Sequence, residues 1–270
     1  MSQELDSLLG KRQRQRRTLI TLIVILAIYC LAAYITKFSS IKTIQTFPEA
    51  FTWIAKHFMP NESSFSKVNS ILDALSETIL MAVAATVTAA LFAFVLALLG
   101  AQSTQLDGKV GQVLGFIARL MASFFRNVPE VVWAMVFLLS FGQSATTGYL
   151  ALFFVTVGTL TRAFIESIDE ASHQAVEALQ ATGASYLQVV GQAIIPSSIA
   201  QFISWVLYMV ETNIRSSTLI GILAGSGIGH IFNLYYRRFR YPAAGLVILF
   251  ILISIFVIEG VSNFVRRKVL

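Results

Sequence analysis

The sequence predicts an all-α, polytopic membrane protein with about six transmembrane helices. Hydrophobic residues make up 56% of the 270 residues and charged residues only 13%, a composition that soluble domains rarely have. The chain also contains several apolar runs of about 20 residues, the length that crosses a bilayer as a helix. Basic residues gather beside the first and the last of these runs. We therefore expect one multi-pass domain in a cell membrane.

Six apolar runs define the expected transmembrane helices, and the charges beside them define their orientation. Five basic residues precede the first run, and Arg266, Arg267 and Lys268 follow the last. The positive-inside rule then places both termini in the cytoplasm, which agrees with an even number of crossings. The same rule explains the basic N-terminal cluster, so no nucleic-acid partner is expected. The runs lie at about 18–35, 78–99, 121–141, 149–165, 199–222 and 243–261.

This order of spans divides the chain into two regions. Residues 1–75 form a cytoplasmic basic N-terminus, the first span and a long outer loop, and residues 76–270 form the core with the other spans. One segment does not fit the positive-inside rule, because Arg237, Arg238 and Arg240 fall on the outer side. Either a span is misplaced, or these residues form an outer basic patch for an anionic substrate or an acidic partner. The sequence leaves both open.

A polar stretch between the fourth and fifth spans is the expected cytoplasmic loop of residues 166–196. Its first half is acidic, and helix-forming residues continue to about residue 194. Gly183 permits a backbone turn between two helices, and Pro196 is expected to end the second one. A helical hairpin at the membrane edge can transmit a rigid-body movement from a partner. The alternative is an amphipathic surface helix that has no partner.

Four ionisable residues lie within the expected spans, where charges are costly and usually face a cavity or a partner. Arg126 and Glu130 are four residues apart, and so are Glu211 and Arg215, so each pair can lie on one face of a helix. Either these are structural ion pairs, or they line a path for an anionic, zwitterionic or polar solute. Pro129 weakens the first pairing because it bends the backbone.

Other polar residues carry weaker signals. Asn127, Asn213 and Ser216 are candidates to contact a solute, although such residues more often hydrogen-bond a neighbouring helix. His57 and His230 lack the spacing of metal ligands, and no metal site is expected. The glycine-rich GSGIG lacks the Gly-Lys-Ser/Thr that completes a phosphate-binding loop. We therefore expect the chain neither to hydrolyse ATP itself nor to act as an enzyme.

The loop sequence EALQATGASYLQVVGQAIIP (177–196) resembles the cytoplasmic loop of permeases from binding-protein-dependent ABC importers. The family loop reads Glu-Ala-Ala, three residues, Gly, nine residues, Ile, any residue, Leu-Pro. Glu177, Ala178, Gly183 and Pro196 keep this spacing. Three positions of the pattern hold other residues, namely Leu179, Ala193 and Ile195.

The resemblance implies the transmembrane domain of a type I ABC importer in a bacterial cell membrane. In that family the loop forms a short coupling helix that docks on a nucleotide-hydrolysing subunit. Glu177, Ala178, Gly183 and Pro196 would then contact this partner. The resemblance further implies two permease copies, expected to be identical, two cytoplasmic ATPases that bind ATP and Mg, and an external solute-binding protein. This chain itself would bind no cofactor.

Two further stretches resemble the permeases for phosphonates: FFRNVPEVVWAMVFLLSFG (124–142) and VETNIRSSTLIGILAGSGIG (210–229). The likeness covers about residues 76–270 and implies import of phosphonates or related phosphorus oxyanions, such as phosphate and phosphite. Arginine suits these solutes because its planar guanidinium group offers two parallel N–H donors to two oxygens.

The alternatives are a permease for methionine or another small solute, an ATPase-independent secondary transporter or channel, and a membrane scaffold, which the charges within spans argue against. The candidate path residues are Arg126, Asn127, Glu130, Glu211, Asn213, Arg215 and Ser216.

Overall fold

The computed structural model describes residues 2–103, 109–171 and 173–269, and the regular structure in these ranges is entirely helical, as predicted. The chain forms two compact units, Met1–Lys56 and His57–Leu270. The elements in chain order are α1 (Ser2–Thr36), α2 (Ser40–His57), α3 (Glu62–Phe65), α4 (Val68–Gly100), α5 (Lys109–Asn127), α6 (Glu130–Phe141), α7 (Ala145–Ala171), α8 (His173–Ala181), α9 (Tyr186–Val189), the π-helix η1 (Val190–Ile194), α10 (Ile195–Ala224), α11 (Gly227–Arg237) and α12 (Tyr241–Val269).

The first unit consists of α1 and most of α2. Within α1, Gln13–Thr36 is long and apolar enough to cross a membrane, as predicted for the first span. The stretch that follows was expected to be an outer loop, but residues 40–57 form a helix of 18 residues. Ile44, Phe47 and Phe51 are exposed along this helix. Their spacing of three and four residues gives α2 an apolar side, which is the pattern of an amphipathic helix.

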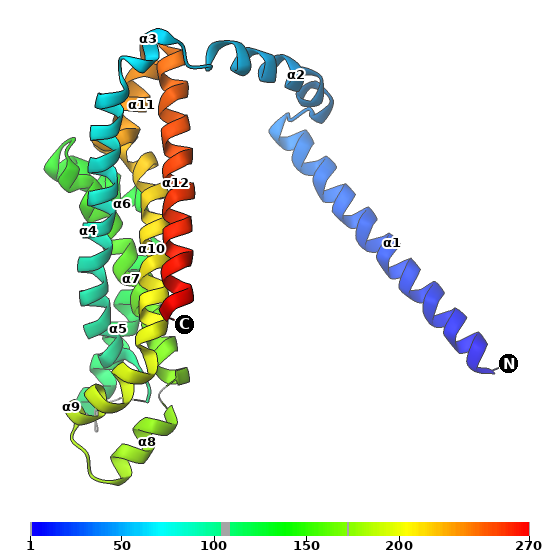
Figure 1. Ribbon diagram of the computed structural model, residues 1–270. Helices are drawn as coiled ribbons and strands as arrows, with labels where there is room; N and C mark the ends of the chain where they lie inside the picture. Colours follow the sequence, from blue (N-terminus) through cyan, green and yellow to red (C-terminus); the bar gives the residue numbers. More distant parts are fainter. Residues whose placement is uncertain (1, 104–108, 172, 270) are drawn as a thin grey trace. The chain divides into compact units, whose positions relative to one another are not determined.

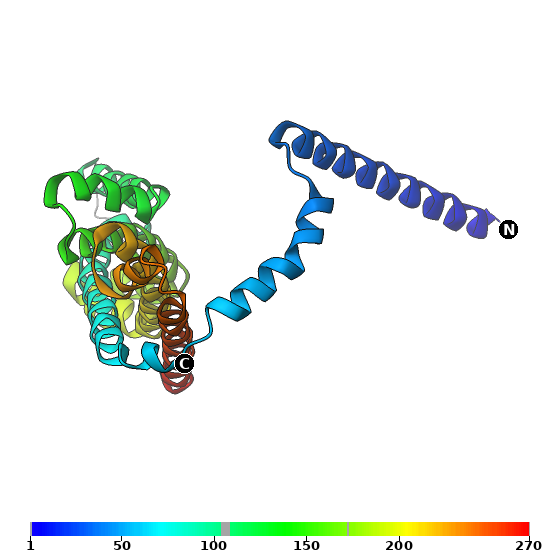
Figure 2. The ribbon, with the colours of Figure 1, turned by 90° about the horizontal axis from the view of Figure 1, so that it is seen from above.

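The second unit is a bundle whose two ends carry different short elements. α3 and α11 lie at one end, here called the α3 end, and α8 and α9 lie at the other, the α8 end (Figure 1). α7 packs against α4, α5, α6 and α10, and the α5–α6 stretch lies at one side of the bundle (Figure 2). This unit begins at His57, ahead of the boundary expected after residue 75, because Phe58 and Ile71 pack with residues of α11 and α12.

The described residues contain five to six candidate membrane spans, in agreement with the expected number of about six. Five helical segments are long and apolar enough to cross a membrane by themselves: the one in α1, α4, α7, the run Tyr186–Ala224 and α12. α5 and α6 pass the same test only as a pair, bent by 90° at the break between them, and the pair is either a broken sixth span or a re-entrant loop. Pro129 explains the break, because it lacks an N–H donor and disfavours a helical conformation at Val128.

The chain runs without interruption from α9 through η1 into α10, which corrects the prediction that Pro196 ends a helix. Pro196 lies instead in the first turn of α10. The helix widens into a π turn just before the proline, where the Ile195 N–H donates to the carbonyl of Val190, five residues earlier. A proline is tolerated in the first turn of a helix, and the wider π turn before Pro196 lets the helix continue through the proline.

Small residues let α5 approach α7 closely. Gly158 marks the contact on α7: a Cβ added there would lie 2.5 Å from the backbone nitrogen of Arg126 and 2.8 Å from the carbonyl oxygen of Ala122. Side-chain rotation cannot relieve a clash with backbone atoms, so this position requires glycine. The residues that α5 buries are likewise small, namely Gly111, Gly115, Ala118 and Ala122.

We expect Gly158→Ala to destabilise the fold, because the added methyl group meets the backbone of α5. Gly260 in α12 is the matched control, since a Cβ there meets nothing within 4 Å. Replacing an exposed helical glycine with alanine normally stabilises by about 1 kcal/mol. Gly260→Ala should therefore keep or raise the unfolding temperature of the protein in detergent, whereas Gly158→Ala should lower it. Equal unfolding temperatures in the two variants would contradict the close approach of α5 to α7.

Candidate functional site

An ion pair on α10 contains two of the predicted charged residues. The Glu211 Oε1 and the Arg215 Nη2 are 2.6 Å apart, and the residues are four positions apart along one helix, as predicted. The side chain of Glu211 is 14% exposed, whereas that of Arg215 is 50% exposed. Both residues lie within the candidate span Tyr186–Ala224. A guanidinium with this exposure at membrane depth requires water or another protein surface beside it.

Arg266 brings a second cation to the same carboxylate. Its Nη2 lies 3.8 Å from the Glu211 Oε2. Two guanidinium groups therefore share one carboxylate, which leaves this group of three residues with a net charge of +1. Sequence reasoning did not connect Arg266 with Glu211, because no local pattern joins residues of two different helices.

Glu130 pairs with α10 and not with Arg126, which corrects the predicted pairing of those two residues. The Ser216 hydroxyl donates to the Glu130 Oε1 at 3.1 Å. Arg126 lies in the last turn of α5 while Glu130 opens α6, and the 90° bend places them on different helix axes. The Asn127 side-chain amide donates to the carbonyl of Ser123 at 2.6 Å, within its own helix. The predicted path residues thus divide into a group on α6 and α10 and a group at the end of α5.

Asn213 joins three helices at a buried junction. The residue is 3% exposed, and its amide nitrogen donates to the Oγ1 atoms of Thr86 and Thr156, each at 2.8 Å. These threonines lie in the middle of α4 and of α7. The sequence predicted a helix–helix hydrogen bond as the more common role for such an asparagine. The sequence did not identify Thr86 and Thr156 as its partners, because no pattern distinguishes these threonines from others in the apolar runs.

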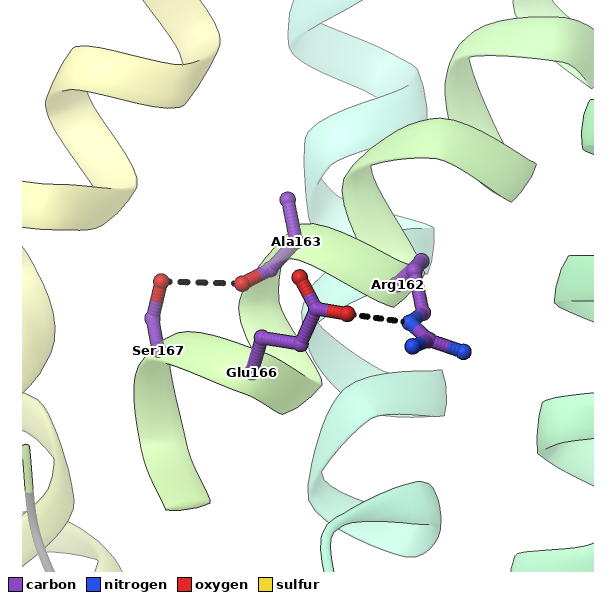
Figure 3. Close-up of polar contacts among 4 residues, drawn as sticks. All are labelled: Arg162, Ala163, Glu166 and Ser167. Carbon is purple, nitrogen blue, oxygen red and sulfur yellow. Dashed lines mark hydrogen bonds and ion pairs between the residues drawn. The ribbon is translucent and has the colours of Figure 1, made fainter. Parts of the chain in front are cut away.

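A cavity between α5 and α7 gathers basic residues near the α8 end of the bundle. Its volume is about 220 Å³, and Arg119, Arg126 and Arg162 line it together with Glu166 and Asp169. The Arg162 Nε bonds to the Glu166 Oε1 at 2.5 Å, one turn apart on α7 (Figure 3). Among these residues the sequence marked only Arg126 as a candidate, since α5 and α7 come together only in the folded chain.

The stretch with the coupling-loop register folds into α8, a tight turn and α9. Gly183 has a φ of +79°, in the left-handed region that glycine adopts without strain. The Ala184 N–H closes the turn by donating to the carbonyl of Leu179 at 3.3 Å. The Gln188 Oε1 then accepts from the Ser185 N–H at 2.8 Å, which caps the start of α9. The predicted turn at Gly183 is therefore present, with a helix on each side.

This coupling segment buries an apolar side and exposes a polar one. Val176, Val189 and Ile194 are buried in a core that also contains Leu160 and Phe164 of α7. The buried side fixes the segment to the bundle and leaves its polar side available to a second protein. The four predicted coupling residues are all exposed: Glu177, Ala178, Gly183 and Pro196.

The three arginines that departed from the positive-inside rule lie at the α3 end, opposite α8. Arg237 is in the last turn of α11. Arg238 lies in the turn that follows, and Arg240 directly precedes α12. All three are exposed. This position fits the interpretation as an exposed basic patch.

Residues 108–270 match the model of a protein family described as the binding-protein-dependent transport system inner membrane component. The chain is 31% identical to the phosphite transport system permease protein PtxC of Stutzerimonas stutzeri, over 79% of this chain and 76% of that protein. It is 30% identical to the phosphate-import permease protein PhnE of Mycolicibacterium smegmatis, over 72% of this chain and 36% of that protein.

Solved structures share the fold at lower sequence identity. A MetNI methionine ABC transporter in an inward-facing conformation superposes with a TM-score of 0.61 and 17% identity, covering 74% of this chain and 98% of that chain. A crystal structure of an amino acid ABC transporter with histidines superposes with a TM-score of 0.61 and 14% identity, covering 77% and 98% of the two chains. These similarities concern the fold alone.

We expect Asn213→Leu to destabilise the bundle by about 1 kcal/mol, the scale of hydrogen bonds between transmembrane helices. The change removes the donor for Thr86 and Thr156 and keeps a side chain of similar size. Thr159→Val is the control, because the Thr159 hydroxyl donates to the carbonyl of Val155 in its own helix. Unfolding in detergent should separate the two variants. A loss of stability in Thr159→Val as large as that in Asn213→Leu would contradict the junction.

Proposed function

The chain belongs to the family of binding-protein-dependent transport system inner membrane components, the permeases of ABC importers, and we propose that it imports phosphonates or related phosphorus oxyanions, such as phosphate and phosphite. The observation that carries this proposal is the group of Arg215, Glu211 and Arg266, which has a net positive charge and a half-exposed guanidinium within a span. Relatives named for phosphite and phosphate transport support the same class of solute.

A transport path along α10 accounts for the exposure of Arg215. Hydrocarbon is a costly surrounding for a half-exposed guanidinium. A second, identical copy of the chain, placed with its α10 against this face, would enclose the arginines in a water-filled path. Glu130 and Ser216 bring α6 and α10 together through their hydrogen bond and contribute polar groups to the same path. Asn213 supports the path from behind, because it is buried against α4 and α7.

The chemistry of the group suits a phosphorus oxyanion. Each guanidinium offers parallel N–H donors that match two oxygens of a phosphonate or phosphate group. Glu211 holds both arginines and offsets one of their charges. Within this group of three residues an anion would meet a single net positive charge, and Glu130 in the same path would weaken the attraction further and favour release. An amino acid such as methionine would need a further carboxylate for its ammonium group, and Glu130 is the candidate for that alternative.

Two ATPase subunits would dock at the α8 end and drive the transport cycle. Glu177, Ala178, Gly183 and Pro196 offer an exposed surface there, and the buried side of the segment connects this surface to α4 and α7. ATP and Mg would bind to the ATPase subunits. Movement of these subunits on ATP binding would pass from α8 to α9 and then into α10. The helix is continuous from Tyr186 at the start of α9 to the end of α10.

The orientation of the bundle follows from the same assignment. With the α8 end in the cytoplasm, the basic residues that end α12 also lie toward the inner side, as the positive-inside rule requires. The α3 end then faces outward, where a solute-binding protein would deliver the anion. The exposed patch of Arg237, Arg238 and Arg240 lies at this end and would meet an acidic surface of that protein.

The proposal is tested by the ATPase activity of the complex reconstituted in proteoliposomes with its ATPase and binding protein. Phosphonate, phosphate, phosphite and methionine are added in turn. Stimulation by a phosphorus oxyanion is the expected result. Stimulation by methionine alone would keep the importer and replace the substrate class. Transport that continues without any ATPase would assign the chain to the secondary transporters and overturn the proposal.

We expect Glu177→Ala and Gly183→Val to reduce transport while the protein still inserts into the membrane. Valine at Gly183 would be forced into the left-handed region, which costs a side-chain-bearing residue about 1–2 kcal/mol. Gly183→Asn is the control, because asparagine tolerates this conformation better. Transport in proteoliposomes, normalised to inserted protein, is the measurement. Normal transport by Glu177→Ala and Gly183→Val would contradict docking at this segment.

We expect Arg215→Ala to abolish oxyanion transport with little effect on the unfolding temperature. Half of the side chain is exposed in the chain alone, so its removal empties little of the packed interior. Arg215→Lys keeps the charge but loses the paired donors and should retain partial transport. If Arg215→Ala fails to accumulate in the membrane, the ion pair with Glu211 is structural instead.

A further inference from the structure

The cavity between α5 and α7 forms a second group of arginines that the path along α10 does not use. Its volume of about 220 Å³ is below the range of about 300–1,000 Å³ typical of pockets for drug-sized ligands, so it suits a small ion. Residues of α5 and α7 line it together with Gly100, where α4 ends. The cavity therefore lies near the α8 end, where transported solute would leave the protein.

The two carboxylates of this cavity are already engaged. Glu166 forms its ion pair with Arg162 at 2.5 Å. Asp169 accepts two hydrogen bonds from Ser103, at 3.0 Å from the backbone N–H and 2.8 Å from the hydroxyl. With both acids counted against the three arginines, the lining keeps a net charge of +1.

The other two arginines have donors to spare. Arg119 donates through Nη1 to the carbonyl of Gly100 at 2.6 Å, which anchors the side chain at the cavity wall. A guanidinium has five N–H donors, so most of those of Arg119 remain for a ligand. The side chain of Arg126 makes no hydrogen bond or ion pair with the part of the chain that the structure describes. Ser123, one turn before Arg126, adds a hydroxyl to the lining.

We propose that this cavity binds a phosphorus oxyanion, with Arg119 and Arg126 as its direct ligands. Paired guanidinium groups in a small pocket with a net positive charge are the donor set that phosphoryl oxygens prefer. The oxyanion is either the free transported anion or the headgroup of an anionic lipid. The first source rests on the proposed function, whereas the second does not. Exposed apolar residues along α5, such as Phe116 and Leu120, give a lipid access to this side of the bundle.

The position of the cavity connects its occupancy to the coupling segment. Ile165 lines the cavity and also belongs to the core that buries Val189 and Val190. A bound oxyanion held by α5 would therefore lie directly beside that core.

Calorimetric titration of the purified chain with phosphate and with methylphosphonate tests the site. All proteins carry Arg215→Gln and Arg266→Gln, which removes both arginines of the α10 path from the measurement. Arg119→Gln and Arg126→Gln are made singly and together, since glutamine keeps a donor for the Gly100 carbonyl. We expect the double variant to bind the anion at least about tenfold more weakly, the scale of lost charge-assisted hydrogen bonds. Arg16→Gln together with Arg17→Gln, two exposed residues of the first unit, is the control that matches the charge lost in the double variant, and it should bind like its parent.

Native mass spectrometry with added phosphatidylglycerol identifies the lipid source. Retention of this lipid by the parent and its loss from the double variant, without binding of phosphate, would assign the cavity to a headgroup. The proposal is overturned if neither phosphate, methylphosphonate nor the lipid depends on Arg119 and Arg126. In that case oxyanion-stimulated ATPase activity of the unmodified complex would still support the proposed function. If the purified chain binds the anion through Arg119 and Arg126 but the complex shows no oxyanion-stimulated ATPase activity, only the proposed function would be overturned.

Discussion

The close approach of the neighbouring helices to α7 determines the rest of the second unit. In a bilayer the hydrophobic effect does not drive helices together, so close packing and hydrogen bonds between helices must hold them. α5 turns glycines and alanines toward α7. Asn213 adds directed hydrogen bonds from α10 to both α4 and α7. The residues that α4 buries are also mostly small, and they include Ala82, Ala85, Ala89 and Ala93.

The charged group around Glu211 and the charged group of the cavity between α5 and α7 share one arrangement, and both lie at the edge of the packed interior. Each contains an arginine and a glutamate one turn apart on the same helix, Arg215 with Glu211 and Arg162 with Glu166. The first group also receives Arg266 from another helix, and the second receives Arg119 and Arg126, one of which Asp169 offsets. The internal pair costs little because its charges cancel, and the added residues leave one net positive charge in each group. Membrane depth thus tolerates these sites while they stay attractive to anions.

The features that depend on residues near one another in the sequence were predictable. Apolar runs predicted the candidate membrane spans, Pro129 predicted the break between α5 and α6, and Gly183 predicted the turn between α8 and α9. The partners across helices were not predictable. Glu130 bonds to Ser216 and not to Arg126 because two helix axes diverge at Pro129, which a count of four residues cannot reveal. Threonines in apolar runs gave no sign that Asn213 would meet them.

The π turn ahead of Pro196 sets the rotational register of the helix that follows it. The helical run from Tyr186 to Arg215 is unbroken, so α9 and the charged group within the span lie on one continuous helix. An α-helix advances about 1.5 Å and turns about 100° per residue. Compared with an unbroken α-helix of the same length, the one wide turn thus rotates the helix beyond it by about 100° and shifts it by about 1.5 Å. This one turn of backbone therefore determines which side of α10, and which set of charges, faces whatever lies beside it.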